Sequence, residues 1–174
     1  MALKSTIFKA DLQVADLERG HYAGYALTIA RHPSETDERM MVRLLAFALH
    51  AGPDLRFGRG VSTEDEPALW EIDAAGSIRL WIDVGLPDEA RLRKASHRAE
   101  RVVVLAYGAR AVDVWWRQNS AALGRLTNLA VWQLRGDEGQ ALAGLAERNM
   151  KLSCTIQEES VYLEGLELHP LRLQ

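Results

Sequence analysis

The chain of 174 residues is 48% hydrophobic and 26% charged, which is typical of a folded globular protein and excludes a disordered or low-complexity chain. Its net charge of -3 means that any binding of nucleic acid would depend on a local group of basic side chains. The longest apolar run, residues 102–109, is too short for a membrane span. Because the first residues lack a secretory apolar block and Cys154 is the only cysteine, we expect a cytoplasmic protein.

Two strands joined by a turn are predicted at the start of the chain. Residues 8–14 alternate between apolar and polar side chains, which is the two-residue period of a strand with one buried face. Residues 25–29 continue this period, and residues 16–20 supply the turn between the two strands. The chain therefore opens with a predicted hairpin.

A helix is predicted after this hairpin. Pro33 cannot donate a hydrogen bond to a strand partner, and Ser34 followed by Asp37 resembles a capping box. Apolar residues then repeat at helical spacing until Gly52 and Pro53 end the element.

The middle of the chain predicts a second hairpin, a helix and a buried strand. Residues 67–73 and 77–84 are strands around a turn at 73–76, and the segment Leu86-Pro87-Asp88 caps a helix that extends to about residue 99. The valine-rich residues 101–107 are predicted as a strand buried on both faces.

The last third continues to alternate between helices and strands. We expect a helix at 111–123, a strand at 129–134, a helix at 137–150 and short strands at 152–157 and 161–164. This order indicates an α/β fold, or α+β by some definitions, in which helices flank a mixed sheet and hairpins are added at both ends. We see no internal boundary, so residues 1–174 are expected to form a single domain.

Acidic residues in the first predicted helix are candidates for chemistry. Glu38 lies three positions before Met41 and seven before Leu45, so helical spacing places it on the inward-facing stripe, where a charge needs a partner. Glu35 lies on the same face, one turn earlier. The alternative is that both are ordinary acids at a helix start, where the helix dipole favours them.

The second hairpin contributes three more acids. A turn centred between residues 74 and 75 would place Glu66 opposite Asp83, with Cβ atoms about 5 Å apart. A one-residue change in loop length would move the pairing to Pro67, which leaves Asp65 and Glu66 as alternatives. Both are equally consistent with a solvated loop. Asp83 lies in an otherwise apolar strand, where burial of an unpaired charge is costly.

Basic residues of the helix that follows Asp83 form a stripe. Arg91, Lys94, Arg98 and Arg101 recur at spacings of three or four, which places them on or near one helical face, with His97 close by. Because the helix follows Asp83 directly, we expect these cations to lie over the same pocket as the carboxylates and to meet phosphate. A solvated helix face has the same pattern and remains the alternative.

Four blocks of sequence stand in a specific order along the chain. They are Met1-Ala2-Leu3-Lys4, Arg31-His32-Pro33-Ser34-Glu35-Thr36, Asp65-Glu66-Pro67 and Gly85-Leu86-Pro87-Asp88-Glu89. Together they resemble the bacterial YaeQ family, and the resemblance covers nearly the whole chain. That family is similar in fold to the PD-(D/E)XK nuclease-like superfamily, in which a helix, a strand hairpin, a second helix and a further strand surround one site.

The resemblance implies roles for particular acids. Glu38 would be the acid of the first helix, Asp65 or Glu66 the first hairpin acid, and Asp83 the acid of the Asp/Glu-x-Lys element. With Glu38, Glu66 and Asp83 as oxygen ligands, such a site would suit Mg²⁺ or Mn²⁺, which would activate water and neutralise charge on a scissile phosphate.

The resemblance also assigns a lysine. Gly85 stands where the superfamily has its lysine, so Lys94 on the following helix would act as a relocated equivalent. We therefore expect a metal-dependent phosphodiesterase that acts on DNA or RNA. Its further residues would be Glu35 or Asp65 as additional ligands and Arg91 and Arg98 at phosphate. The alternative is a module that binds nucleic acid or protein without catalysis, because fold does not determine function.

Overall fold

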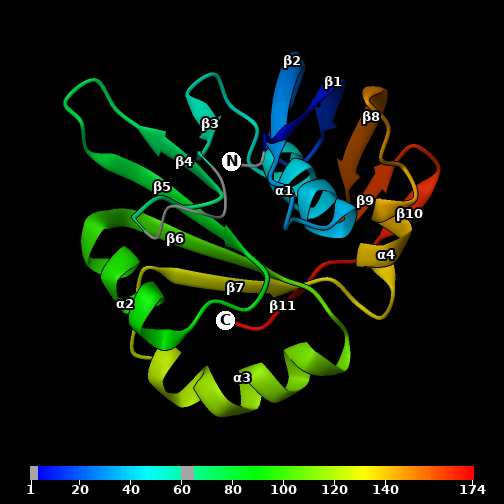
Figure 1. Ribbon diagram of the computed structural model, residues 1–174. Coiled ribbons are helices and arrows are strands. Elements are labelled where there is room, and N and C mark those ends of the chain that lie inside the picture. Colours follow the sequence, from blue (N-terminus) through cyan, green and yellow to red (C-terminus); the bar gives the residue numbers. More distant parts are fainter. Residues whose placement is uncertain (1–3, 60–64) are drawn as a thin grey trace.

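The computed structural model describes residues 4–59 and 65–174, and within these ranges the chain forms two mixed sheets and four helices (Figure 1). The strands of the first sheet are β1 (Thr6–Asp16), β2 (His21–Arg31), β8 (Asn149–Gln157), β9 (Ser160–Leu163) and β10 (Leu166–Leu168). They lie in the order β10-β9-β8-β1-β2. Because β1 pairs in parallel with β8, the N-terminal hairpin and residues 149–168 share this sheet.

The second sheet is built from the middle of the chain and its last residues. Its strands are β3 (Leu55–Phe57), β4 (Leu69–Ile72), β5 (Ile78–Val84), β6 (Ala99–Ala106), β7 (Leu129–Gln133) and β11 (Leu171–Arg172). They lie in the order β11-β7-β6-β5-β4-β3. Strands β5, β6 and β7 are parallel, so their carboxyl ends meet at one edge of the sheet.

The helices lie on both faces of this six-stranded sheet. They are α1 (Asp37–Leu49), α2 (Glu89–Arg98), α3 (Arg110–Leu123) and α4 (Glu138–Ala143). Helix α1 lies between the two sheets, α4 lies beside α1, and α2 and α3 cover the opposite face (Figure 1). On β5, Ile82 packs in the core with α1, whereas Trp81 packs in the core with α2 and α3.

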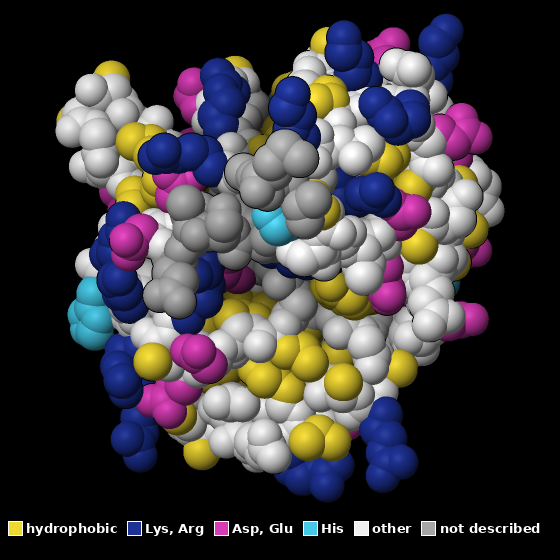
Figure 2. Space-filling model, in the orientation of Figure 1, with side chains coloured by type: hydrophobic (Ala, Val, Ile, Leu, Met, Phe, Trp, Pro, Cys, Tyr) yellow, Lys and Arg dark blue, Asp and Glu magenta, His cyan; other side chains and the backbone are white. Residues whose placement is uncertain are grey.

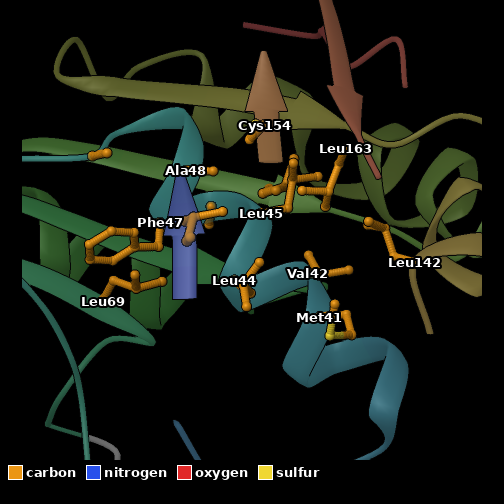
Figure 3. Close-up of a cluster of buried hydrophobic side chains, with 14 of the residues drawn as sticks. Met41, Val42, Leu44, Leu45, Phe47, Ala48, Leu69, Leu142, Cys154 and Leu163 are labelled. Carbon is orange, nitrogen blue, oxygen red and sulfur yellow. The ribbon is translucent and has the colours of Figure 1, made fainter. Parts of the chain in front are cut away.

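Helix α1 forms the centre of the larger core. Every residue from Met40 to Ala48 is buried, because the helix has a sheet on either side. Figure 3 shows Leu69 of β4, Cys154 of β8 and Leu163 of β9 around this helix. The buried run therefore joins the two sheets through one apolar helix.

Several local predictions are confirmed. The three predicted hairpins are present, as β1–β2, β4–β5 and β8–β9. Asp88 is the N-cap of α2, and its side chain accepts a hydrogen bond from the backbone N–H of Arg91. The mixed α/β composition with sheets flanked by helices is also confirmed.

Other predictions need correction. The first helix is capped by Thr36, which accepts from the N–H of Arg39, and not by a box of Ser34 and Asp37. The terminal hairpins do not extend one sheet but pair with each other in a sheet of their own. The helix predicted at 137–150 ends at Ala143, because Asn149 begins the strand that pairs with β1. Strands β3, β10 and β11, of three, three and two residues, were not predicted.

No helix in residues 4–59 and 65–174 is long and apolar enough to cross a membrane. Met1 to Leu3, which belong to the first of the four sequence blocks, lie outside the described residues.

Candidate functional site

Asp83 is a buried carboxylate on β5 and both of its oxygens accept hydrogen bonds. Arg91 of α2 donates from Nε to Oδ2 at 2.8 Å and from Nη2 to Oδ1 at 2.9 Å. The indole Nε1 of Trp81 donates to Oδ2 at 3.0 Å. The Asp83 side chain is only 6% exposed. Because a bidentate guanidinium offsets the desolvation of a carboxylate well, Arg91 explains how this charge is tolerated.

The connection between β5 and α2 positions Arg91. Gly85 follows β5 with a φ of +93°, a left-handed conformation that favours glycine. Asp88 then caps α2 and accepts a hydrogen bond from the Arg91 N–H at 2.8 Å. Arg91 is therefore held in the first turn of α2, from which its side chain reaches back to Asp83. Gly85 thus serves as a turn residue.

The segment before β4 is tied to α2. Arg91 Nη2 donates to the carbonyl oxygen of Glu66 at 2.9 Å, and Arg98 Nη1 donates to that of Asp65 at 2.9 Å. Lys94 Nζ donates to the Asp65 carboxylate at 2.7 Å, and this hydrogen bond lowers the pKa of Asp65. Three basic side chains of one helix therefore hold the two acidic residues in place.

The carboxylate of Glu66 faces Arg59. It accepts from the Arg59 backbone N–H at 3.0 Å and from the Arg59 Nε at 2.8 Å. The pKa of Glu66 lies below its ordinary value, chiefly because of the backbone hydrogen bond. Glu66 is thus buried and neutralised by a different guanidinium from the one that binds Asp83.

The predicted pairing of Glu66 opposite Asp83 is wrong. Strands β4 and β5 pair with Leu69 opposite Ile82, and the register shifts at an irregularity near the turn. Such a shift moves every later pair along the strand. Glu66 precedes β4, and its main chain approaches Asp83 only through the shared contact with Arg91.

Glu35 is buried at the start of α1 and binds two arginines. Arg43 donates from Nε and Nη2 to the two oxygens of Glu35, both at 2.8 Å, and Arg39 donates to Oε1 at 2.7 Å. Arg43 also donates to the carbonyl oxygen of Ala30 in β2. Burial lowers the pKa of Arg43 below its ordinary value. This cluster links α1 to the first sheet.

Glu38 lies on the side of α1 that contacts α4. A Cβ atom placed on Gly139 would lie 2.4 Å from Glu38 Oε1, so the carboxylate packs directly against the glycine backbone. Tyr107, which follows β6, interacts electrostatically with Glu38, and burial raises the pKa of its phenol.

The structure does not bring Glu38 and Asp83 together. Helix α1 packs on the face of the six-stranded sheet that contains Ile82, whereas Asp83 contacts Trp81 on the face covered by α2. Neighbouring residues of a strand face opposite sides of a sheet. Within residues 4–59 and 65–174, no three His, Cys, Asp or Glu side chains form a group that could hold a metal ion.

Basic side chains gather around the Arg91–Asp83 pair. We call Arg91, Lys94 and Arg98 the α2 basic face. The side chain of Lys94 is 60% exposed, and that of Arg59, beside Glu66, is 81% exposed. Figure 2 shows Lys and Arg side chains along the left of the view, in the region of α2, with Asp and Glu side chains among them and further basic side chains elsewhere on this face. This region offers cations to solvent while its buried carboxylates face inward.

Sequence reasoning missed Trp81 and Arg59 as parts of this region. The guanidinium of Arg98 lies 5.1 Å from the ring centroid of Trp81, which packs beneath the α2 basic face. Trp81 lies two positions before Asp83, so the strand period places both on one face and could have identified it. Arg59 lies seven positions before Glu66 in the connection between β3 and β4, and no periodicity or motif in the sequence marks their contact.

Comparison with known proteins identifies the family. The model of the YaeQ protein family matches residues 1–169. YaeQ of Salmonella typhi is 48% identical over 94% of this chain and 90% of its own length, and YaeQ of Escherichia coli K12 is 45% identical over the same shares. The crystal structure of YaeQ from Xanthomonas axonopodis pv. citri superposes with a TM-score of 0.95 at 46% identity, covering 98% of both chains. YaeQ from Pseudomonas syringae has a TM-score of 0.93 at 41% identity, over 98% of this chain and 96% of its own. The chain therefore belongs to the YaeQ family.

Proposed function

We propose that this protein binds the phosphates of nucleic acid through the α2 basic face and Arg59, without metal-dependent cleavage. The observation that carries the proposal is the bidentate pair between Arg91 and Asp83. The acid that a nuclease-like site would use to bind a metal is bound to a guanidinium, and exposed cations surround the pair.

The donor set argues against a Mg²⁺ or Mn²⁺ site built from Glu38, Glu66 and Asp83. Both oxygens of Asp83 accept from nitrogen donors, and both oxygens of Glu66 accept from Arg59. Glu38 lies on the other face of the sheet. A hard cation needs several oxygen ligands around one point, and these three acids do not provide it.

The exposed cations suit phosphate better than their present partners. Lys94 and Asp65 form an ion pair in solvent, with side chains 60% and 78% exposed, and exposed pairs of this kind contribute little stability. A phosphate could therefore replace Asp65 as the partner of Lys94 at small cost. Arg98 contacts Asp65 and Arg59 contacts Glu66, and both supply planar guanidinium groups, which bind phosphate in a bidentate manner.

The resemblance to the PD-(D/E)XK superfamily supports nucleic acid as the ligand. The resemblance implies a site built around the central hairpin and the following helix, and here these elements carry Asp83 and the α2 basic face. Gly85 in place of the lysine, together with the Arg91–Asp83 pair, supports retention of binding without hydrolysis.

The proposal is tested by the salt dependence of binding. Labelled DNA and RNA oligonucleotides are titrated with the protein at several salt concentrations, and the slope of log K against log salt counts the phosphates neutralised. The double variant Lys94→Ala/Arg98→Ala is expected to reduce the slope by about 2, roughly one for each cation removed. Arg93→Ala is the matched control: Arg93 belongs to α2 but is exposed and pairs with Glu89, so its loss should leave the slope unchanged.

Two outcomes would contradict the proposal. The proposal is wrong if the intact protein binds neither oligonucleotide at low salt. It is also wrong if the slope is unchanged in the double variant, because the α2 basic face would then not be the binding surface. The same samples are incubated with Mg²⁺ and with Mn²⁺, and we expect intact oligonucleotides. Cleavage that disappears in Asp83→Asn would instead support a metal-dependent phosphodiesterase.

A further inference from the structure

A cavity of about 210 Å³ lies between the two sheets, on the face of β5 opposite the α2 basic face. Its walls are apolar and come from both sheets. Ile82, Val103, Leu105 and Trp132 line it from the six-stranded sheet, and Ile156 and Val161 line it from the five-stranded sheet. The cavity is therefore separate from the surface proposed to bind nucleic acid.

One end of the cavity is polar and contains an ion pair between Asp16 and Arg19. The buried carboxylate of Asp16 accepts from the N–H groups of Glu18 and Arg19, each at 3.0 Å, and from Arg19 Nε at 2.6 Å. Arg19 Nη1 donates to the carbonyl oxygen of Ala51 at 3.1 Å. Asp16 and Arg19 therefore neutralise each other, whereas Glu18 and Glu159, which also line the cavity, add negative charge at this end.

Among residues 4–59 and 65–174, His50 places an imidazole ring without a hydrogen-bond partner at this site. It is the C-cap of α1 and lines the cavity, yet its ring takes part in no hydrogen bond within the described residues. Burial lowers the pKa of His50 to about 4. At neutral pH the imidazole is therefore uncharged and presents one N–H donor and one nitrogen acceptor.

We propose that this cavity binds a small uncharged molecule that has a compact apolar body and one hydroxyl or amide group, with the polar group hydrogen-bonded to the His50 ring. The size supports this class, since an apolar cavity of about 150 Å³ already accommodates benzene. An anion is disfavoured because Glu18 and Glu159 also line the cavity. The walls of Ile82, Val103 and Trp132 would enclose the apolar body.

The test compares two probes of nearly equal size, phenol and toluene, by isothermal calorimetry. Both should bind the intact protein, with phenol about 5- to 10-fold tighter because of one hydrogen bond to His50. In His50→Leu phenol should bind more weakly than toluene, because its hydroxyl would be buried without a hydrogen-bond partner. Toluene bound as tightly as phenol by the intact protein would overturn the proposed role of His50.

A second part of the test fills the cavity with larger side chains. Ala46 lines the cavity from α1, and Ala46→Leu should abolish binding of both probes. Val161→Phe fills the same space from β9 and replaces this variant if Ala46→Leu does not fold, as judged by near-UV circular dichroism. Ala141→Leu is the control, because Ala141 is exposed on α4 and its enlargement should leave binding intact. No binding to the intact protein, or unchanged binding in the filled variants, would overturn the proposal.

Discussion

Removal of Arg91 is expected to destabilise the protein strongly, because it leaves Asp83 as a buried charge. The Asp83 side chain is 6% exposed, and Arg91 supplies hydrogen bonds to both of its oxygens. Breaking a buried pair by removal of one partner costs about 3–5 kcal/mol. We therefore expect Arg91→Met to lower the free energy of unfolding by about 3–5 kcal/mol, measured by urea denaturation at pH 7.

The opposite truncation should cost less. In Asp83→Asn the side chain keeps an acceptor for Trp81, and Arg91, with a side chain 27% exposed, can be hydrated. The double variant Arg91→Met/Asp83→Asn should therefore be more stable than Arg91→Met alone. A double-mutant cycle over these three variants should give a coupling energy between Arg91 and Asp83 of about 0.5–3 kcal/mol. Arg93→Ala, on the solvent side of the same helix, should change stability by less than about 0.5 kcal/mol. A loss below about 1 kcal/mol in Arg91→Met would refute the view that this arginine neutralises Asp83.

Two further predictions concern pH and close packing. The folded-state pKa of His50 is about 4, below its ordinary value of 6.5, so the unfolded chain takes up a proton in this window while the folded protein does not. The free energy of unfolding should fall by about 3 kcal/mol as the pH drops through this window. Urea denaturation at neutral and at acidic pH should show that His50→Leu abolishes this part of the loss. Equal losses in the intact protein and in His50→Leu would contradict the prediction. In Gly58→Ala the new Cβ would lie 2.0 Å from the carbonyl oxygen of Pro67, so urea denaturation should show a loss of about 1–3 kcal/mol. Gly52→Ala meets nothing closer than 3.9 Å and serves as the control; equal stability of the two variants would exclude the clash.

Local signals predicted the hairpins and the second helix well. The alternation of residues 8–14 and the turn after them correspond to β1 and β2, and Asp88 caps α2 as its position before the helix indicates. In these elements the interactions that define the structure lie within a few residues of each other. Apolar periodicity and capping residues are therefore sufficient to predict these elements.

The pairing of strands that are distant in the sequence could not be predicted from local patterns. Residues 149–150 were included in a predicted helix, but Asn149 is paired beside Lys9 in the parallel ladder of β1 and β8. The hydrogen bonds that this ladder provides outweigh a weak local preference for helix. Because the partner strand lies at the other end of the chain, no window of sequence around residue 149 contains it.

For the candidate site, the sequence by itself determined which groups would need a partner. Asp83 in an apolar strand and Arg91, Lys94 and Arg98 at helical spacing are properties of residue order, and the structure pairs Asp83 with Arg91. Only the tertiary structure decided which face of the sheet each group occupies. Helix α1, which carries Glu38, packs against the Ile82 side of β5, whereas Asp83 faces the side covered by α2. The reason is geometric: the period of a strand specifies two faces, but the packing of distant helices determines what covers each of them.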